Sequence, residues 1–142
     1  MTSRFTATDM VNGVIRVLVD RGYSSFLVRS DRLDAAFEGA YRRARALAPE
    51  YDLDVRFRIA RDDFGESEVL RAALNGAGQR DVVSFDNPEY QDMRADRAKV
   101  ALTVRLERLP GPPQLYAELA DSFIEAYERF AADDDLENVA AG

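Results

Sequence analysis

Carboxylates, arginines and tyrosines are the side chains with which this 142-residue chain could do chemistry, because it contains no cysteine and no histidine. Without histidine, the chain lacks the commonest general base and the commonest transition-metal ligand. Without cysteine, it has no thiolate nucleophile and no thiolate ligand for zinc. We therefore assign no catalytic residue, expect no metal and no cofactor, and favour a non-catalytic role.

Two groups of carboxylates could still serve an enzyme, since paired carboxylates bind Mg²⁺ or act as an acid and a base. The first group follows a predicted strand and comprises Asp62, Asp63, Glu66 and Glu68. The second group, Asp52 and Asp54, shares a predicted strand face with Arg56 and Arg58. The first spacing fits a helix capping box, and mixed charges are typical of a solvated strand face. We prefer these structural roles and keep a carboxylate-based, Mg²⁺-dependent enzyme as an alternative.

Six arginines in the first half of the chain form a candidate anion-binding surface, namely Arg42, Arg43, Arg45, Arg56, Arg58 and Arg61. Residues 1–61 hold 11 arginines and 8 acidic residues, although the whole chain has a net charge of −7 and a pI of about 4.7. Arginine suits two-point contacts with phosphate and carboxylate. A nucleic-acid or anionic-ligand binding module is therefore an alternative. The acidic balance disfavours nucleic acid, and pairing with the chain's own carboxylates is the simpler interpretation.

Four aromatic side chains recur at helical spacing near the C-terminus, namely Tyr116, Phe123, Tyr127 and Phe130. Such a stripe is typical either of a core face or of a surface that binds a partner. The predicted first helix is also apolar on more than one side, and a small sheet does not cover two such helices completely. We therefore expect a protein partner or a homo-oligomer, with this stripe facing the partner.

Apolar residues at steps of three and four predict helices over residues 6–20, 31–47, 66–75 and 113–131. Either Thr6 with Asp9, or Thr8 alone, would cap the start of the first helix, and Gly22 stands at the position of a left-handed C-cap. The second has a clear single stripe of Leu33, Ala36, Phe37, Ala40, Tyr41, Ala44 and Leu47. Residues 75–78 are expected to unwind the third, since they contain two glycines.

Strands are predicted over residues 24–29, 52–60, 81–85 and 98–107, the second and fourth from strict alternation. The fourth would point Val100, Leu102 and Val104 inward. The fold class is then α/β, or α+β: one mixed sheet of about four strands with helices packed on it, in the order α-β-α-β-α-β-β-α. This order resembles that of thioredoxin-type proteins, but Ser30-Asp31-Arg32-Leu33 stands where that family keeps its redox cysteine pair, so no redox function is implied.

The chain is expected to form one globular domain over residues 1–131, followed by an acidic, flexible tail over residues 132–142. It has no recognisable leader and no apolar stretch long enough for a membrane helix, so we expect a cytoplasmic protein that does not bind membranes. Together these observations favour a non-catalytic, acidic interaction protein: an accessory subunit, an inhibitor of a basic partner, or a component of an oligomeric scaffold.

Overall fold

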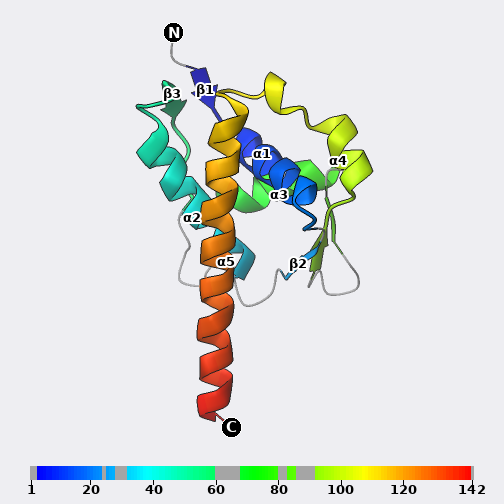
Figure 1. Ribbon diagram of the computed structural model, residues 1–142, viewed down its shortest axis with the longest axis vertical. Coiled ribbons are helices and arrows are strands. Elements are labelled where there is room, and N and C mark those ends of the chain that lie inside the picture. Colours follow the sequence, from blue (N-terminus) through cyan, green and yellow to red (C-terminus); the bar gives the residue numbers. More distant parts are fainter. Residues whose placement is uncertain are drawn as a thin grey trace.

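The computed structural model describes residues 3–23, 25–27, 32–59, 68–79, 83–85 and 92–141. Its helices are α1 (Ala7–Asp20), α2 (Arg32–Leu47), α3 (Glu68–Gln79), α4 (Arg97–Thr103), the 3₁₀ helix η2 (Leu106–Arg108) and α5 (Pro113–Ala141). Its strands are β1 (Ser3–Phe5), β2 (Ser25–Leu27), β3 (Leu53–Val55), β4 (Ser84–Phe85) and β5 (Asp92–Arg94). Figure 1 shows the helices gathered around α1, with short strands at two edges.

The predicted α/β fold is wrong, because helices make up 69% of the described residues and no four-stranded mixed sheet is found among them. Strands β1 and β3 form a parallel pair, and β2, β5 and β4 form a small antiparallel sheet in that order. Each strand has only two or three residues, so these sheets bury too little to organise a core. The resemblance to the thioredoxin-type order of elements is therefore also wrong, because it depended on the predicted sheet.

Helix α1 is the central element of the core. Of the two N-cap candidates, the structure uses Thr6 with Asp9: they form a capping box in which Thr6 Oγ1 accepts from the Asp9 backbone N–H and Asp9 Oδ2 accepts from the Thr6 N–H. Its end is the predicted left-handed C-cap, with Gly22 at a φ of 97°. Helices α3, α4 and α5 all pack on α1. The apolar residues around α1 are therefore covered within the chain, and they no longer argue for an oligomer.

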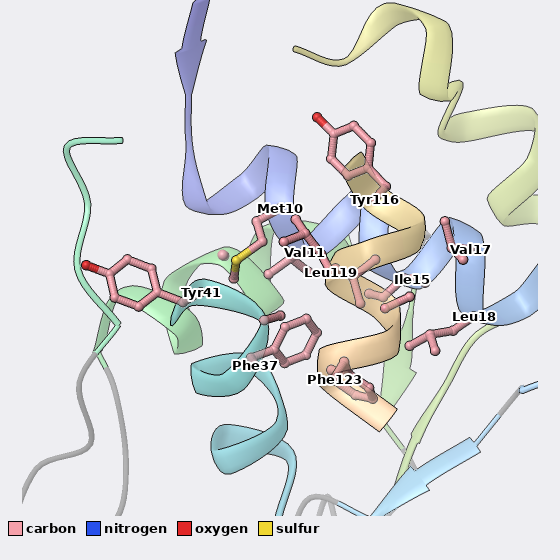
Figure 2. Close-up of a cluster of buried hydrophobic side chains, with 14 of the residues drawn as sticks. Met10, Val11, Ile15, Val17, Leu18, Phe37, Tyr41, Tyr116, Leu119 and Phe123 are labelled. Carbon is pink, nitrogen blue, oxygen red and sulfur yellow. The ribbon is translucent and has the colours of Figure 1, made fainter. Parts of the chain in front are cut away.

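The closest approach in the core is between α1 and α5. A side chain at Gly13 would overlap the ring of Tyr116, so the ring lies directly on the α1 backbone. Tyr116 is fully buried, and its hydroxyl donates to the carbonyl oxygen of Pro110 at 2.5 Å. Figure 2 shows this ring above the cluster that α1, α2 and α5 share. Glycine at position 13 lowers the helix propensity of α1, but it allows this close helix–helix contact.

Helix α2 packs along α5 in the opposite direction. Near the start of α2, the rings of Phe37 and Phe123 meet edge to face with centroids 4.8 Å apart, and near its end Arg43 lies beside Glu118. The predicted stripe is confirmed, since all seven of its residues are buried: Leu33, Ala36, Phe37, Ala40, Tyr41, Ala44 and Leu47. A second polar link joins α2 to α3, where buried Asp34 accepts from Arg71 at 2.5 Å.

The alternation over residues 52–59 is confirmed at some positions and does not give the predicted sheet strand, since Val55 and Phe57 are half-buried, as is Asp54. Leu53 and Ile59 are buried and Arg56 and Arg58 are exposed, as predicted. Only Leu53–Val55 forms a strand, and its partner is the N-terminal strand β1, which the sequence did not predict. Residue 60 lies outside the described part of the chain.

The predicted strand over residues 98–107 is wrong. Residues 97–103 form α4, capped by the Asp96 side chain, which accepts from the Lys99 N–H at 2.9 Å. Residues 100 and 104 are four apart, so a helical turn buries Val100 and Val104 together while Leu102 is 77% exposed. Val100 and Val104 would lie on one face both in an alternating strand and in a helix, so the sequence pattern does not distinguish the two. The contacts of this segment with α1 favour the helix.

Three further features differ from the sequence prediction. Helix α3 continues through residues 75–78 to Gln79, and its Val69 is 39% exposed. Strand β5 lies between the predicted strands 81–85 and 98–107, where the sequence predicted no element. Helix α5 continues past the predicted end at residue 131 to Ala141. The predicted capping box at residues 63–66 lies outside the described residues, as do the ends of the strands predicted at 24–29 and 81–85.

Candidate interaction surfaces

Four of the predicted anion-binding arginines, three on α2 and one just after β3, contact the chain's own side chains. Arg42 pairs with Glu38 at 2.6 Å, Arg43 with Glu118 at 3.7 Å and Arg56 with Asp54 at 2.8 Å, while Arg45 donates to the hydroxyl of Tyr41 at 3.2 Å. Arg58 is exposed and has no ion pair among the described residues, and Arg61 lies outside them. Three of the six predicted arginines thus pair with carboxylates of the same chain.

This pairing weakens the case for an anion site there. An incoming phosphate or carboxylate would have to compete with the acidic partners already in place, so part of its Coulomb energy would replace an existing contact. Exposed ion pairs are weak, typically below about 1 kcal/mol, so the competition is modest for each arginine. Anion binding by Arg42, Arg43, Arg45, Arg56, Arg58 and Arg61 remains a prediction.

The aromatic stripe of α5 divides between the core and the surface. Tyr116 and Phe123 are fully buried, and burial raises the pKa of Tyr116 above its ordinary value. Tyr127 is half-buried and stacks on Phe123 with ring centroids 5.9 Å apart. The side chain of Phe130 lies outside the described part. Of the described aromatic residues of the stripe, Tyr127 is the one that a partner could contact, together with neighbouring Ile124. Binding of a partner by this stripe stays a prediction.

The predicted carboxylate groups give no assembled metal site in the described part of the chain. Asp54 is engaged by Arg56, and Asp52 adopts a left-handed backbone at the turn before β3, with φ of 55°. Within the described residues, no three or more acidic side chains come close enough to hold a metal ion together. Asp62, Asp63 and Glu66 lie outside these residues, and Glu68 is the exposed first residue of α3.

Helix α5 carries the net charge of the chain. Residues 113–142 hold eight acidic residues and one arginine, whereas residues 1–112 hold 18 of each sign. The first acids of α5 attach it to the rest of the fold: Glu118 accepts from Tyr51 at 2.8 Å, and Asp121 pairs with Arg21 at 2.6 Å. The hydrogen bond to Glu118 and burial raise the pKa of Tyr51 above its ordinary value.

The later acids of α5 lie beyond this attachment. Glu125 pairs with Arg129 on the helix itself, and Asp133, Asp134, Asp135 and Glu137 follow in its last turns. Figure 1 shows these turns extending away from the rest of the described chain. We call residues 130–141 the acidic end of α5. Its backbone is helical to Ala141, through the segment predicted to be a flexible tail, and the flexibility of that segment in solution stays a prediction.

A cationic surface on α4 and η2 escaped the sequence analysis. Arg97, Lys99, Arg105 and Arg108 are all exposed, and none of their charged groups forms an ion pair among the described residues. The exposed side chain of Leu102 lies between them in sequence. Residues 94–108 hold five basic and two acidic residues. This local positive charge is not visible when the charges of the whole second half of the chain are added, because that half is acidic. A local count along the chain would have found this surface.

Comparison with known proteins gives no relative for this chain: no family model matches it, and neither a curated protein nor a solved structure resembles it significantly. Of the helices in the described residues, none combines the length and apolar character that a membrane-spanning segment requires. The functional argument therefore depends on the surfaces described above.

Proposed function

We propose that this chain is a non-catalytic, acidic interaction protein that binds a positively charged protein surface through the acidic end of α5. The observation that carries the proposal is the location of charge. The rest of the chain is electrically balanced, and the surplus of seven negative charges lies on one helix that extends beyond the fold. Such a concentration attracts a basic partner and speeds its encounter.

The division of labour along α5 supports this role. Its first half is fixed by burial of Tyr116, Leu119 and Phe123 and by the ion pair of Asp121 with Arg21. This attachment fixes the point at which the following turns leave the fold. A rigid base that presents a charged helix suits an accessory subunit or an inhibitor of a basic partner.

Charge also favours a different protein over a second copy of this chain. Two acidic ends side by side would place like charges together, which is unfavourable near a protein surface. The other sequence argument for an oligomer was the apolar surface of α1, and α3, α4 and α5 cover that surface. A homo-oligomeric scaffold is therefore less favoured than a basic partner. An acidic binding surface also requires no catalytic group.

The proposal is tested by affinity capture from the native host at low and moderate salt. The test variant is Asp133→Asn, Asp134→Asn and Asp135→Asn together. A control variant with the same charge change is Glu50→Gln, Glu68→Gln and Glu107→Gln, all exposed and outside α5. We expect a basic partner that the control variant retains, that the test variant loses, and that salt weakens. Capture of only a second copy, equal capture by both variants, or no partner would contradict the proposal.

A further inference from the structure

A polar cleft lies between the start of α1 and the segment that leaves α4, away from the acidic end of α5. Its volume is about 240 Å³. Its walls are formed by Thr8, Asp9 and Asn12 from α1 and by Leu102, Thr103, Val104, Arg105, Arg108 and Leu109 from the facing segment. Ligand sites for drug-sized molecules are usually about 300–1,000 Å³, so this cleft suits a smaller molecule.

One wall is a polar stripe on α1 whose members are four residues apart. Arg16 ties the stripe to α4, since its Nη1 donates to the carbonyl oxygens of Ala101 and Val104 at 2.9 and 3.0 Å. One turn earlier, Asn12 lines the cleft, and its side-chain oxygen is buried without a hydrogen-bond partner among the described residues. A buried acceptor without a donor is costly and uncommon. Because this oxygen has almost no accessible surface, a ligand donor reaches it only after the side-chain amide rotates toward the cleft.

The facing wall carries two guanidinium groups. Arg105 and Arg108 flank η2, and the Arg108 N–H donates to the Arg105 carbonyl oxygen at 3.0 Å, which closes a 3₁₀ turn. Neither guanidinium forms an ion pair among the described residues, and both line the cleft. Two unneutralised cations on one side form a place for an anion.

We propose that this cleft binds a small molecule in which a carboxylate or phosphate group lies next to a hydroxyl or amino group. The anionic group contacts Arg105 and Arg108, and the neighbouring donor contacts the Asn12 oxygen. Asp9 shapes this preference, because one of its oxygens accepts from the Thr6 N–H while its negative charge remains in the wall. That negative charge repels a ligand that is only an anion. It favours a ligand that also carries a hydrogen-bond donor such as a hydroxyl or amino group.

The ligand class is tested by calorimetric titration of the full chain with two matched pairs of probes. Acetate and glycolate differ by a hydroxyl next to a carboxylate, and inorganic phosphate and glycerol 3-phosphate differ by a carbon backbone that bears hydroxyls. We expect saturable binding that is tighter for the hydroxyl-bearing member of at least one pair. The pair that binds distinguishes a carboxylate ligand from a phosphate ligand. Equal binding within both pairs, or no saturable binding, would overturn the proposal.

Variants locate the binding. Arg105→Gln and Arg108→Gln should each weaken binding about tenfold, since each removes one charge-assisted contact. Arg97→Gln makes the same charge change on α4 outside the cleft and should leave binding unchanged. Asn12→Leu should remove the preference for the hydroxyl-bearing probe and leave the melting temperature the same or higher. Equal weakening by Arg97→Gln, or a hydroxyl preference that survives Asn12→Leu in a folded protein, would overturn the proposal.

Discussion

Two regions of the molecule are rich in arginine, and they use it differently. On α2 and just after β3, Arg42, Arg43 and Arg56 pair with carboxylates of the same chain. On α4 and η2, Arg105 and Arg108 have no acidic partner among the described residues, although the chain as a whole is acidic. The density of arginine in the sequence is similar. In the first region three arginines are neutralised by carboxylates of the same chain, although Arg58 is exposed and has no ion pair among the described residues. In the second region both arginines of the cleft keep their charge available to a ligand.

The difference teaches that the neighbours of a cation decide its role more than its number in the sequence. Glu38 is one helical turn from Arg42, and Asp54 is two residues from Arg56, so local spacing already neutralises part of the first region. Glu118 reaches Arg43 only through the packing of α5 on α2. The second region faces α1, whose Arg16 donates to backbone carbonyl oxygens at the end of α4 and whose Asp9 places one carboxylate at the cleft.

The largest expected effect is at the most deeply paired arginine. Asp34 is fully buried and accepts from Arg71, so Arg71→Met leaves a carboxylate buried without this cation. We expect a loss of about 3 kcal/mol in the free energy of unfolding, measured by urea denaturation. Arg97→Met, at an exposed and unpaired position, should cost less than about 0.5 kcal/mol. Equal losses for the two variants would show that pairing does not separate these arginines.

The next effect is at Arg16, which holds α4 through two backbone carbonyls and also pairs with Asp20 at 3.0 Å. Arg16→Met should lower the free energy of unfolding by about 2 kcal/mol, because the carbonyls at the end of α4 lose charged hydrogen bonds. Hydrogen exchange should accelerate in α4 before it does in α2. Uniform acceleration over both helices would contradict a local anchoring role.

A smaller effect compares the two regions directly. Arg42→Gln with Arg56→Gln removes two exposed ion pairs and should cost up to about 1 kcal/mol. Arg105→Gln with Arg108→Gln removes two unpaired like charges and should cost nothing or stabilise slightly, since their mutual repulsion disappears. Denaturant midpoints for the two double variants are the measurement. A larger loss for the second pair would reveal a structural role for these arginines.

The smallest effect concerns pH. The hydrogen bond that Tyr51 donates to Glu118 raises the pKa of Tyr51 in the folded chain. Its contribution to stability is therefore full below the unfolded pKa of about 10 and is lost as pH rises through the folded pKa. Glu118→Gln should shift the tyrosine absorbance titration to lower pH, whereas Glu125→Gln, on the exposed side of α5, should not. An unchanged titration in Glu118→Gln would remove Glu118 as the cause.

The sequence predicted those parts of the fold that depend on local spacing. The capping box of Thr6 and Asp9, the left-handed Gly22 and the single stripe of α2 need only neighbouring residues, and all three are confirmed. The sheets failed because their strands are two or three residues long and pair with distant segments, as β1 does with β3. Such pairs leave too short a pattern in the sequence to be recognised.

The errors in α4 and in the candidate site have a common cause. Alternation over residues 98–107 fits a strand, but Val100 and Val104 also share a helical face, and Arg16 stabilises the end of that helix from α1. Taken as a strand, this segment hid the exposure of Leu102 and the 3₁₀ turn between Arg105 and Arg108. Summing charge over a predominantly acidic half then concealed the cationic surface.

The measurement that tests the contrast between the two arginine regions most directly is a nuclear magnetic resonance titration with glycerol 3-phosphate, followed at the arginine Nε–H signals. If pairing decides which arginines are available, the Arg105 and Arg108 signals shift and saturate together with the side-chain amide of Asn12. The signals of Arg42 and Arg56 then stay in place over the same range. Shifts at Arg42 and Arg56 with the same or a lower midpoint would contradict the account.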